Sequence, residues 1–154
     1  MIRPYKIEDK EKLIDLLRFN IPQYFDPAEE SDFIAYLKCF TDNYFVVEEN
    51  GQIIGCGGFN YSEYSDEKSI ANISWDIIHP DFHGKGIGKK LTQFRINKIK
   101  QNATINIIRV RTKQLVYMFY EKIGFVLEKT EKDFWAKGFD LYQMKMTLNT
   151  TTIA

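Results

Sequence analysis

The chain has 154 residues, 44% of them hydrophobic and 15% aromatic, which is long enough for one core and short for two domains. Lys plus Arg and Asp plus Glu both number 21, so the formal net charge is zero and argues against a nucleic-acid-binding protein. No apolar run reaches the length of a membrane span, and the first residues are too polar for a secretory signal. We therefore expect one compact, soluble, cytoplasmic domain with neither nucleic acid nor membrane as a partner.

The first part of the chain has the residue patterns of a strand, two helices and a β-hairpin. The expected elements are a strand at 2–6, helices at 9–19 and 26–40, and strands at 44–49 and 52–59. Asp9 can cap the first helix, and residues 26–29 (DPAE) have the order of a capping box for the second. Asn50-Gly51 is a strong hairpin signal, so the two strands that flank it should pair antiparallel.

The rest of the chain alternates strands with helices, which indicates an α/β protein. The expected elements are strands at 69–78, 105–111, 125–130 and 139–148, and helices at 87–101 and 114–123. The right-handed crossover rule makes the second of these strands parallel to the first. Alternation along 69–78 predicts one face with Ile73, Trp75 and Ile77. It predicts a second face with Asn72, Ser74, Asp76 and Ile78.

A glycine-rich, basic segment, 83–89 (HGKGIGK), separates the strand 69–78 from the helix that follows it. The first turn of a helix leaves backbone N–H groups without internal partners at the positive end of the dipole, where a phosphate satisfies them. Glycines let a pyrophosphate approach the backbone, and the lysines add charge. A plain turn before a solvated helix is the alternative, because short glycine motifs also occur by chance. The letters fit neither the P-loop nor the dinucleotide fingerprint.

The segment His83-Gly84-Lys85-Gly86-Ile87-Gly88 resembles motif A of the GNAT superfamily of acyl-CoA-dependent N-acyltransferases, with His83 where the family has Gln or Arg. Residues 112–125 (TKQLVYMFYEKIGF) resemble motif B of the same family, at the right separation. The resemblance covers nearly the whole chain. It implies an α/β fold of the α+β type, with a mixed, mostly antiparallel central sheet, a splayed parallel strand pair and flanking helices. A single GNAT domain would span 1–148, and 149–154 would be a frayed tail.

The resemblance also implies an activity, namely direct transfer of an acetyl group from acetyl-CoA to a primary amine of a small molecule or protein in a ternary complex, with no metal. Tyr120 matches the tyrosine that protonates the departing thiolate in the family, whereas aromatic packing in the core is its alternative role. The residues implied to bind the cosubstrate are the strand backbone at Ile77 and Ile78 and the loop residues His83, Gly84, Lys85, Gly86, Ile87, Gly88 and Lys89.

The general base is the point at which the chain departs from the family, because Asn72 stands where some members have a glutamate. Asp76 is the first substitute, with a structural carboxylate as its alternative role, and Glu63 is the second. The candidate residues of the acceptor cleft are Tyr24, Phe25, Tyr61 and Glu63.

Two other functions stay open. The missing carboxylate at Asn72 is compatible with a non-catalytic acyl-CoA-binding or sensing module. An RNA-binding domain is the more remote alternative, and its basic residues would be Arg95, Lys98, Lys100, Arg109 and Arg111. The amine acceptor stays open between a small molecule and a peptide, and exposed sheet edges are compatible with a homodimer.

Overall fold

The computed structural model describes residues 1–62 and 69–148, so the predicted tail 149–154 lies outside the described residues. Its strands are β1 (Ile2–Pro4), β2 (Tyr44–Glu49), β3 (Gln52–Tyr61), β4 (Ile70–Ile78), β5 (Ile107–Thr112), β6 (Val126–Ala136) and β7 (Phe139–Thr147). Its α-helices are α1 (Lys10–Arg18), α2 (Glu29–Cys39), α3 (Ile87–Lys100) and α4 (Tyr117–Ile123). No helix within the described ranges is long and apolar enough to cross a membrane.

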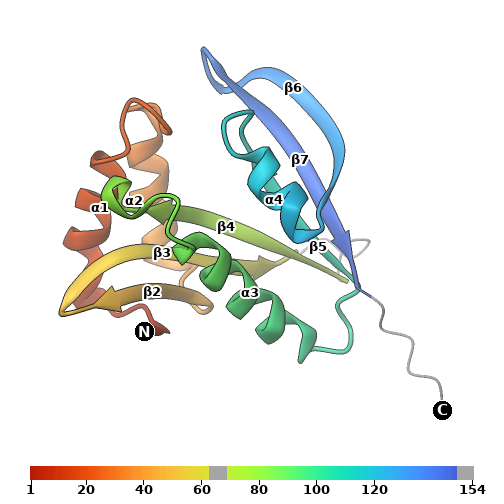
Figure 1. Ribbon diagram of the computed structural model, residues 1–154, viewed down its shortest axis with the longest axis horizontal. Helices are drawn as coiled ribbons and strands as arrows, with labels where there is room; N and C mark the ends of the chain where they lie inside the picture. The colour runs from red at the N-terminus through yellow and green to blue at the C-terminus, as the bar shows by residue number, and fades with distance from the viewer. Residues whose placement is uncertain (63–68, 149–154) are drawn as a thin grey trace.

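The described strands form one seven-stranded sheet in the order β1-β2-β3-β4-β5-β7-β6 (Figure 1). Every neighbouring pair is antiparallel except β4 and β5, which are parallel. The parallel ladder ends at the pair Ile73–Val110, although β4 continues to Ile78 and β5 to Thr112. The sheet therefore opens between its two central strands. This arrangement confirms the predicted mixed, mostly antiparallel sheet with one parallel pair.

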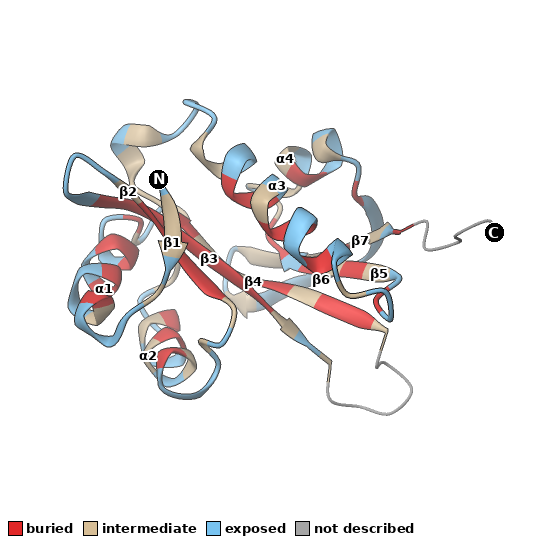
Figure 2. Cartoon of the chain, turned by 90° about the horizontal axis from the view of Figure 1, so that it is seen from below, coloured by how far each residue is buried: buried red, intermediate tan, exposed pale blue. Residues whose placement is uncertain are grey.

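Helices cover both faces of the sheet. Figure 2 shows α1 and α2 on one side of β3 and β4, and α3 and α4 on the other. Leucines spaced along α1 pack with Phe33 and Leu37 of α2 against β2 and β3. On the opposite face, Leu91, Ile96 and Ile99 of α3 pack with the β4–β5 pair and with residues of α4 and β7. The apolar stripes of α1 and α2 therefore pack on one face of the sheet, and the apolar stripe of α3 packs on the other.

Polar side chains fix the entry into the first two helices. The carboxylate of Asp9 stands at the start of α1 but does not cap it, because Asp9 accepts a hydrogen bond from Lys6 N (2.9 Å) and pairs with Arg3 (2.9 Å). The predicted box before α2 forms both of its bonds. Asp26 Oδ2 accepts from Ala28 N (2.9 Å), and Glu29 Oε2 accepts from Asp26 N (2.8 Å).

A β-bulge interrupts β4 where the sheet opens. β3 pairs with β4 up to Ser74 and again from Ile77, so that Trp75 and Asp76 together oppose a single residue of β3. Trp75 has a φ of 49°, a conformation that bulky residues rarely adopt. An extra residue in one strand reverses the alternation of side chains beyond it.

The predicted assignment of faces along this strand is therefore wrong beyond the bulge. Ile73 belongs to the core beneath α3 and α4, whereas Ile77 belongs to the core beneath α1 and α2. Trp75 packs against the aromatic residues of α2. Asp76 turns to the opposite face and bonds to side chains of α3 and α4, so it does not share a face with Asn72.

Candidate active site

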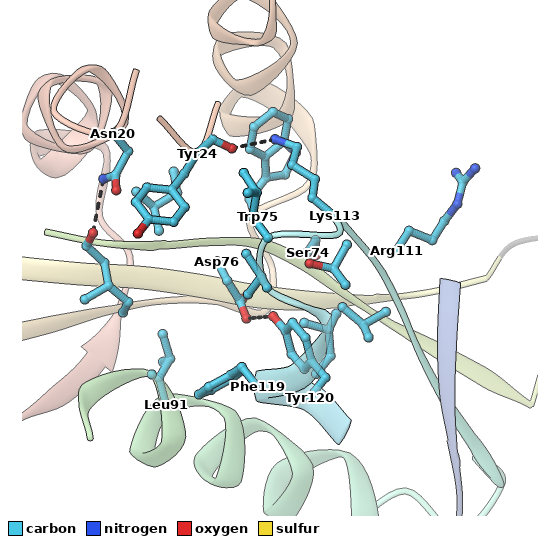
Figure 3. Close-up of a pocket in the computed structure, with 18 of the residues that line it drawn as sticks. Asn20, Tyr24, Ser74, Trp75, Asp76, Leu91, Arg111, Lys113, Phe119 and Tyr120 are labelled. Carbon is cyan, nitrogen blue, oxygen red and sulfur yellow. Dashed lines mark hydrogen bonds between the residues drawn. The ribbon is translucent and has the colours of Figure 1, made fainter. Parts of the chain in front are cut away.

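A pocket of about 1290 Å³ occupies the opening between β4 and β5 (Figure 3). It is lined by the second half of β4, by β5, by the glycine-rich segment and by residues of α4 and the α1–α2 connection. Sites for one small ligand occupy roughly 300–1,000 Å³. The pocket therefore has room for a long ligand together with part of a second one.

The glycine-rich segment forms one end of this pocket. Gly84 and Gly86 have φ values of 75° and 82°, and a Cβ built on either residue meets no atom within 4 Å. The first backbone bond within α3 runs from Lys90 N to Gly86 O (3.1 Å). The N–H groups of the preceding turn have no carbonyl partner within the helix, so this open backbone surface is suited to an anion.

The predicted loop residues differ in their relation to the pocket. Those that line it are His83, Gly84, Gly86, Ile87, Gly88 and Lys89, together with Ile77 and Ile78 of β4. Lys85 does not line it, and its Nζ lies 5.3 Å from the centre of the Phe82 ring. Gly88 lines the pocket and also packs closely, because an added Cβ would lie 3.3 Å from the ring of Phe119.

His83 connects the loop to β4. Its Nε2 donates to the carbonyl of Ile78 (2.8 Å), which also accepts from Asn20 Nδ2 (3.1 Å). The His83 ring meets Tyr24 edge to face at 5.1 Å. The end of β4 is thus held in place by side chains from two other segments. Asn20 is a site residue that the sequence did not reveal, because an Asn before a Pro indicates only the end of a helix.

Tyr120 and Asp76, which line the pocket, form a hydrogen-bonded cluster with Arg95, which is fully buried and does not line it. The Tyr120 hydroxyl donates to Asp76 Oδ2, as Figure 3 shows. Arg95 donates to both oxygens of the same carboxylate, and the bond from Nη2 to Oδ2 measures 2.8 Å. Burial raises the pKa of the Tyr120 phenol well above its ordinary value, and the charge of Asp76 raises it further. Tyr120 therefore stays protonated well beyond neutral pH.

The fully buried guanidinium of Arg95 is satisfied on every side. Besides Asp76 it donates to the carbonyls of Leu91 (3.3 Å) and Gly58 (3.1 Å) and to Thr92 Oγ1 (3.1 Å). A Cβ at Gly57 would lie 2.9 Å from Arg95 Nη1, so only glycine leaves room for the ion pair beneath the bulge. Because Arg95 is buried, it is not available for the surface that an RNA-binding domain would need.

A second buried ion pair, which the sequence did not reveal, lies beside Tyr24 and Phe25 in the pocket. Lys113 Nζ donates to Glu29 Oε2 (2.8 Å) and to the carbonyl of Tyr24 (2.9 Å). The same ammonium lies 4.0 Å from the centre of the Phe25 ring. Loss of solvation on burial lowers the pKa of Lys113. The sequence predicts Glu29 only as a capping residue, since nothing local indicates a partner so far along the chain.

The acceptor residues predicted from the sequence are only partly brought together. Tyr24 and Phe25 line the pocket, and the Phe25 ring stacks on Trp75 at 6.2 Å. Tyr61 does not line it and packs against Phe59 at 5.8 Å, while Glu63 lies outside the described residues. Across the described ranges, no group of three or more His, Cys, Asp or Glu side chains is placed to hold a metal ion.

Comparisons with known proteins agree with this geometry. The model of the acetyltransferase (GNAT) domain matches residues 41–127. An uncharacterized N-acetyltransferase, ycf52, of Gracilaria tenuistipitata var. liui is 31% identical over 98 residues, which make up 60% of this chain and 52% of that protein. An N-alpha-acetyltransferase of Sulfurisphaera tokodaii is 25% identical over 161 residues, 96% of this chain and 92% of that protein. The chain therefore spans about half of the first relative's length and nearly all of the second's.

Solved structures share the fold at lower identity. The yncA protein of Salmonella typhimurium, crystallised with its cofactor acetyl-CoA, superposes with a TM-score of 0.78 at 16% identity, covering 100% of this chain and 96% of that one. The ribosomal-protein-S18-alanine N-acetyltransferase of Escherichia coli gives a TM-score of 0.79 at 13% identity, covering 99% of this chain and 96% of that one. At these identities the likeness establishes the fold.

Proposed function

Because this chain belongs to the GNAT acetyltransferase family, we propose that it transfers an acetyl group from acetyl-CoA directly to a primary amine within a ternary complex. One observation carries the proposal. One pocket runs from the open backbone at the start of α3, through the gap between β4 and β5, to the phenol of Tyr120. A long donor with a phosphate at one end and a reactive thioester at the other matches that path.

The residues of the pocket fit such a donor. The pyrophosphate would be held by the backbone of the glycine loop and the first turn of α3, with Lys89 beside it. β4 has no ladder with β5 beyond Ile73, so its backbone around Ile77 and Ile78, apart from the Ile78 carbonyl that Asn20 and His83 already bond, would offer hydrogen bonds to the amides of the pantetheine arm and to the thioester oxygen. In this proposal the backbone N–H groups of the loop bind the pyrophosphate, and glycines at 84 and 86 allow the positive φ values that this backbone conformation has.

In the proposed reaction the amine nitrogen attacks the thioester carbon, a C–N bond forms and the C–S bond breaks. The amine gives up a proton and the departing thiolate takes one up. Tyr120 is the proposed acid, and its hydroxyl would turn from Asp76 to the sulfur. A thiolate with an ordinary pKa of about 8.5 is a weak base toward this phenol. The hydrogen bond to sulfur is therefore the main stabilisation that Tyr120 supplies.

Asp76 contributes, in this proposal, through Tyr120 and not as the base for the amine. Its carboxylate already accepts hydrogen bonds from Arg95 and from Tyr120, and the bulge turns it away from the face of Asn72. A carboxylate held in this way orients the phenol, while Arg95 offsets the charge that develops when Tyr120 shares its proton.

The donor assignment is tested by the thermal midpoint of the purified protein with acetyl-CoA, CoA, ATP and NADH in separate samples. A ligand at about a hundred times its Kd stabilises the native state by about 2.7 kcal/mol, so both CoA species should raise the midpoint and the other two should not. No shift with either CoA species would remove the basis of the proposal.

The acid role is tested by Tyr120→Phe, with Tyr117→Phe as the matched control. Tyr117 lies on the same helix, packs on Tyr142 at 4.6 Å and does not line the pocket. We expect Tyr120→Phe to lower kcat by about a hundredfold or more with acetyl-CoA affinity nearly intact. An unchanged kcat would remove Tyr120 from the mechanism. Acetyl-CoA binding without thiol release across a broad amine panel would favour the acyl-CoA-binding module.

A further inference from the structure

Three cationic residues follow one another on a single face of the strand that borders the opening. Arg109, Arg111 and Lys113 alternate along β5 and its end, while Ile108 and Val110 point into the core beneath α3 and α4. All three cationic residues line the pocket. They lie on the side of α2, because Lys113 bonds to the first residue of that helix. Three cationic side chains therefore lie along this wall of the pocket.

The described carboxylates in and beside the pocket offset only part of this charge, and one of them, Glu128 on β6, pairs with Arg109 at 3.4 Å. Of the described residues that line the pocket, two are carboxylates, and each already has a buried cation as partner: Glu29 pairs with Lys113, and Asp76 pairs with Arg95. Arg111 forms no ion pair within the described part of the chain. Among the described residues, the guanidinium of Arg111 is thus the charge on this wall that no carboxylate offsets.

Arg111 is held in position by aromatic rings. Its guanidinium carbon lies 4.9 Å from the ring centre of Phe134 and 5.9 Å from that of Trp135. The hairpin that carries these rings is fastened to the end of β5, because Trp135 Nε1 donates to the carbonyl of Thr112 (3.2 Å). Stacking covers the flat face of a guanidinium and leaves its edge free, and that edge matches a carboxylate through two parallel hydrogen bonds.

We propose that the acceptor is a primary amine that also carries a carboxylate, and that Arg111 binds this carboxylate. The inference rests on the proposed acetyl transfer and names the class of its substrate. Arg111 directly follows Val110, the last residue of β5 paired with β4, and its side chain lines the pocket, so a carboxylate on it would lie within the same pocket as the opening.

The apolar part of the acceptor also has a matching surface. Phe25 and Trp75 line the pocket as a stacked pair, 6.2 Å apart, and Lys113 Nζ lies 4.0 Å from the centre of the Phe25 ring. Such an aromatic surface fits the side chain of an amino acid better than the repeated ammonium groups of a polyamine, which Arg111 would repel.

The test compares amino acids with their own carboxamides as acceptors, with thiol release as the readout. L-Phenylalanine, L-leucine, L-methionine, β-alanine and γ-aminobutyrate, each beside its amide, sample both the spacing of the two groups and the apolar part. We expect the best acid to exceed its amide by about 10- to 100-fold in kcat/KM, the range typical of a charge-assisted hydrogen bond.

Arg111→Met should abolish this preference, and Arg111→Lys should restore only part of it, because an ammonium lacks the planar fork. The loss should appear in KM more than in kcat, since Arg111 holds the acceptor and does not touch the reacting atoms. Arg18→Met is the matched control. Arg18 lies on α1, pairs with Glu30 (2.7 Å) and does not line the pocket. The thermal shift with acetyl-CoA verifies that each variant is folded and binds the donor.

Each outcome decides between the two proposals. Acids and amides that react equally well, or an Arg111→Met variant that keeps the preference, would overturn the carboxylate assignment while acetyl transfer stands. Transfer to uncharged amines alone would do the same. No thermal shift with acetyl-CoA, or no thiol release with any amine, would instead refute the proposed function and the acceptor class with it.

Discussion

The buried cluster of Asp76, Arg95 and Tyr120 makes a strong prediction about stability. The side chain of Arg95 is fully buried and that of Asp76 is 22% exposed. Asp76→Asn keeps the shape of the side chain but removes the negative charge, so the guanidinium stays buried without a counter-ion. Removing one partner of a buried ion pair costs about 3–5 kcal/mol. Because carbonyls of Leu91 and Gly58 still accept from Arg95, we expect a value near the lower end, about 3 kcal/mol.

The measurement is urea unfolding at neutral pH with a thermal scan beside it. A loss of about 3 kcal/mol lowers the thermal midpoint of a domain of this size by about 6–12 °C. Arg95→Met should also destabilise, and the double variant should lose less free energy of unfolding than the sum of the two, because neither charge is then left alone. Glu30→Gln, at an exposed pair with Arg18 on the surface, is the control and should change almost nothing.

Two results would refute this reasoning. A loss below about 1 kcal/mol in Asp76→Asn would mean that the ion pair is solvated or dispensable. Strict additivity of the double variant would mean that the two charges do not interact in the folded protein, whatever their distance. Either result would also weaken the role of Asp76 in orienting Tyr120.

Three further predictions concern pH and the glycines. Burial and the charge of Asp76 raise the pKa of Tyr120, so the phenol stays protonated up to about pH 10. We therefore expect that ionisation of Tyr120 does not lower kcat below that pH. A fall of kcat below about pH 10 that disappears in the Tyr120→Phe variant would contradict this. Gly86→Glu should abolish the thermal shift with acetyl-CoA, whereas Gly51→Glu, at a glycine with similar φ and open space outside that pocket, should keep it. Gly57→Ala should lower stability by about 1–3 kcal/mol in urea unfolding, because its Cβ would lie 2.6 Å from Asp76 Oδ1; full stability would show that the bulge yields easily.

Local patterns in the sequence predicted most of the elements. The turn at Asn50-Gly51 forms with positive φ at both residues, and its flanking strands pair antiparallel as expected. The glycine segment and α3 follow β4 in the predicted order. These features depend on residues close together in the chain, where spacing and backbone preference act directly. The strand β6 extends to Ala136, whereas the predicted strand ends at residue 130. The exposed residues between these two points are largely polar and show little apolar periodicity.

The features that sequence reasoning missed depend on residues far apart in the chain. Lys113 and Glu29 are 84 positions apart, and no local pattern marks either residue as the partner of a buried charge. The bulge at Trp75 is likewise a property of two strands, since it exists only in the pairing of β4 with β3. The sequence of β4 alone predicts uninterrupted alternation, and that is why Asp76 was assigned to the wrong face.

The bulge also explains how one opening can serve two substrates. Before it, β4 presents Ser74 to the face of α2, where Ser74 bonds to Tyr36; after it, Asp76 faces α3 and α4. The ladder with β5 ends at the same level, so no backbone pairing closes the sheet there. In the proposed reaction the donor enters from the side of α3 and the acceptor from the side of α2, and they meet through the sheet. A strand without the bulge would return Asp76 to the acceptor face and leave Tyr120 without the partner that orients it.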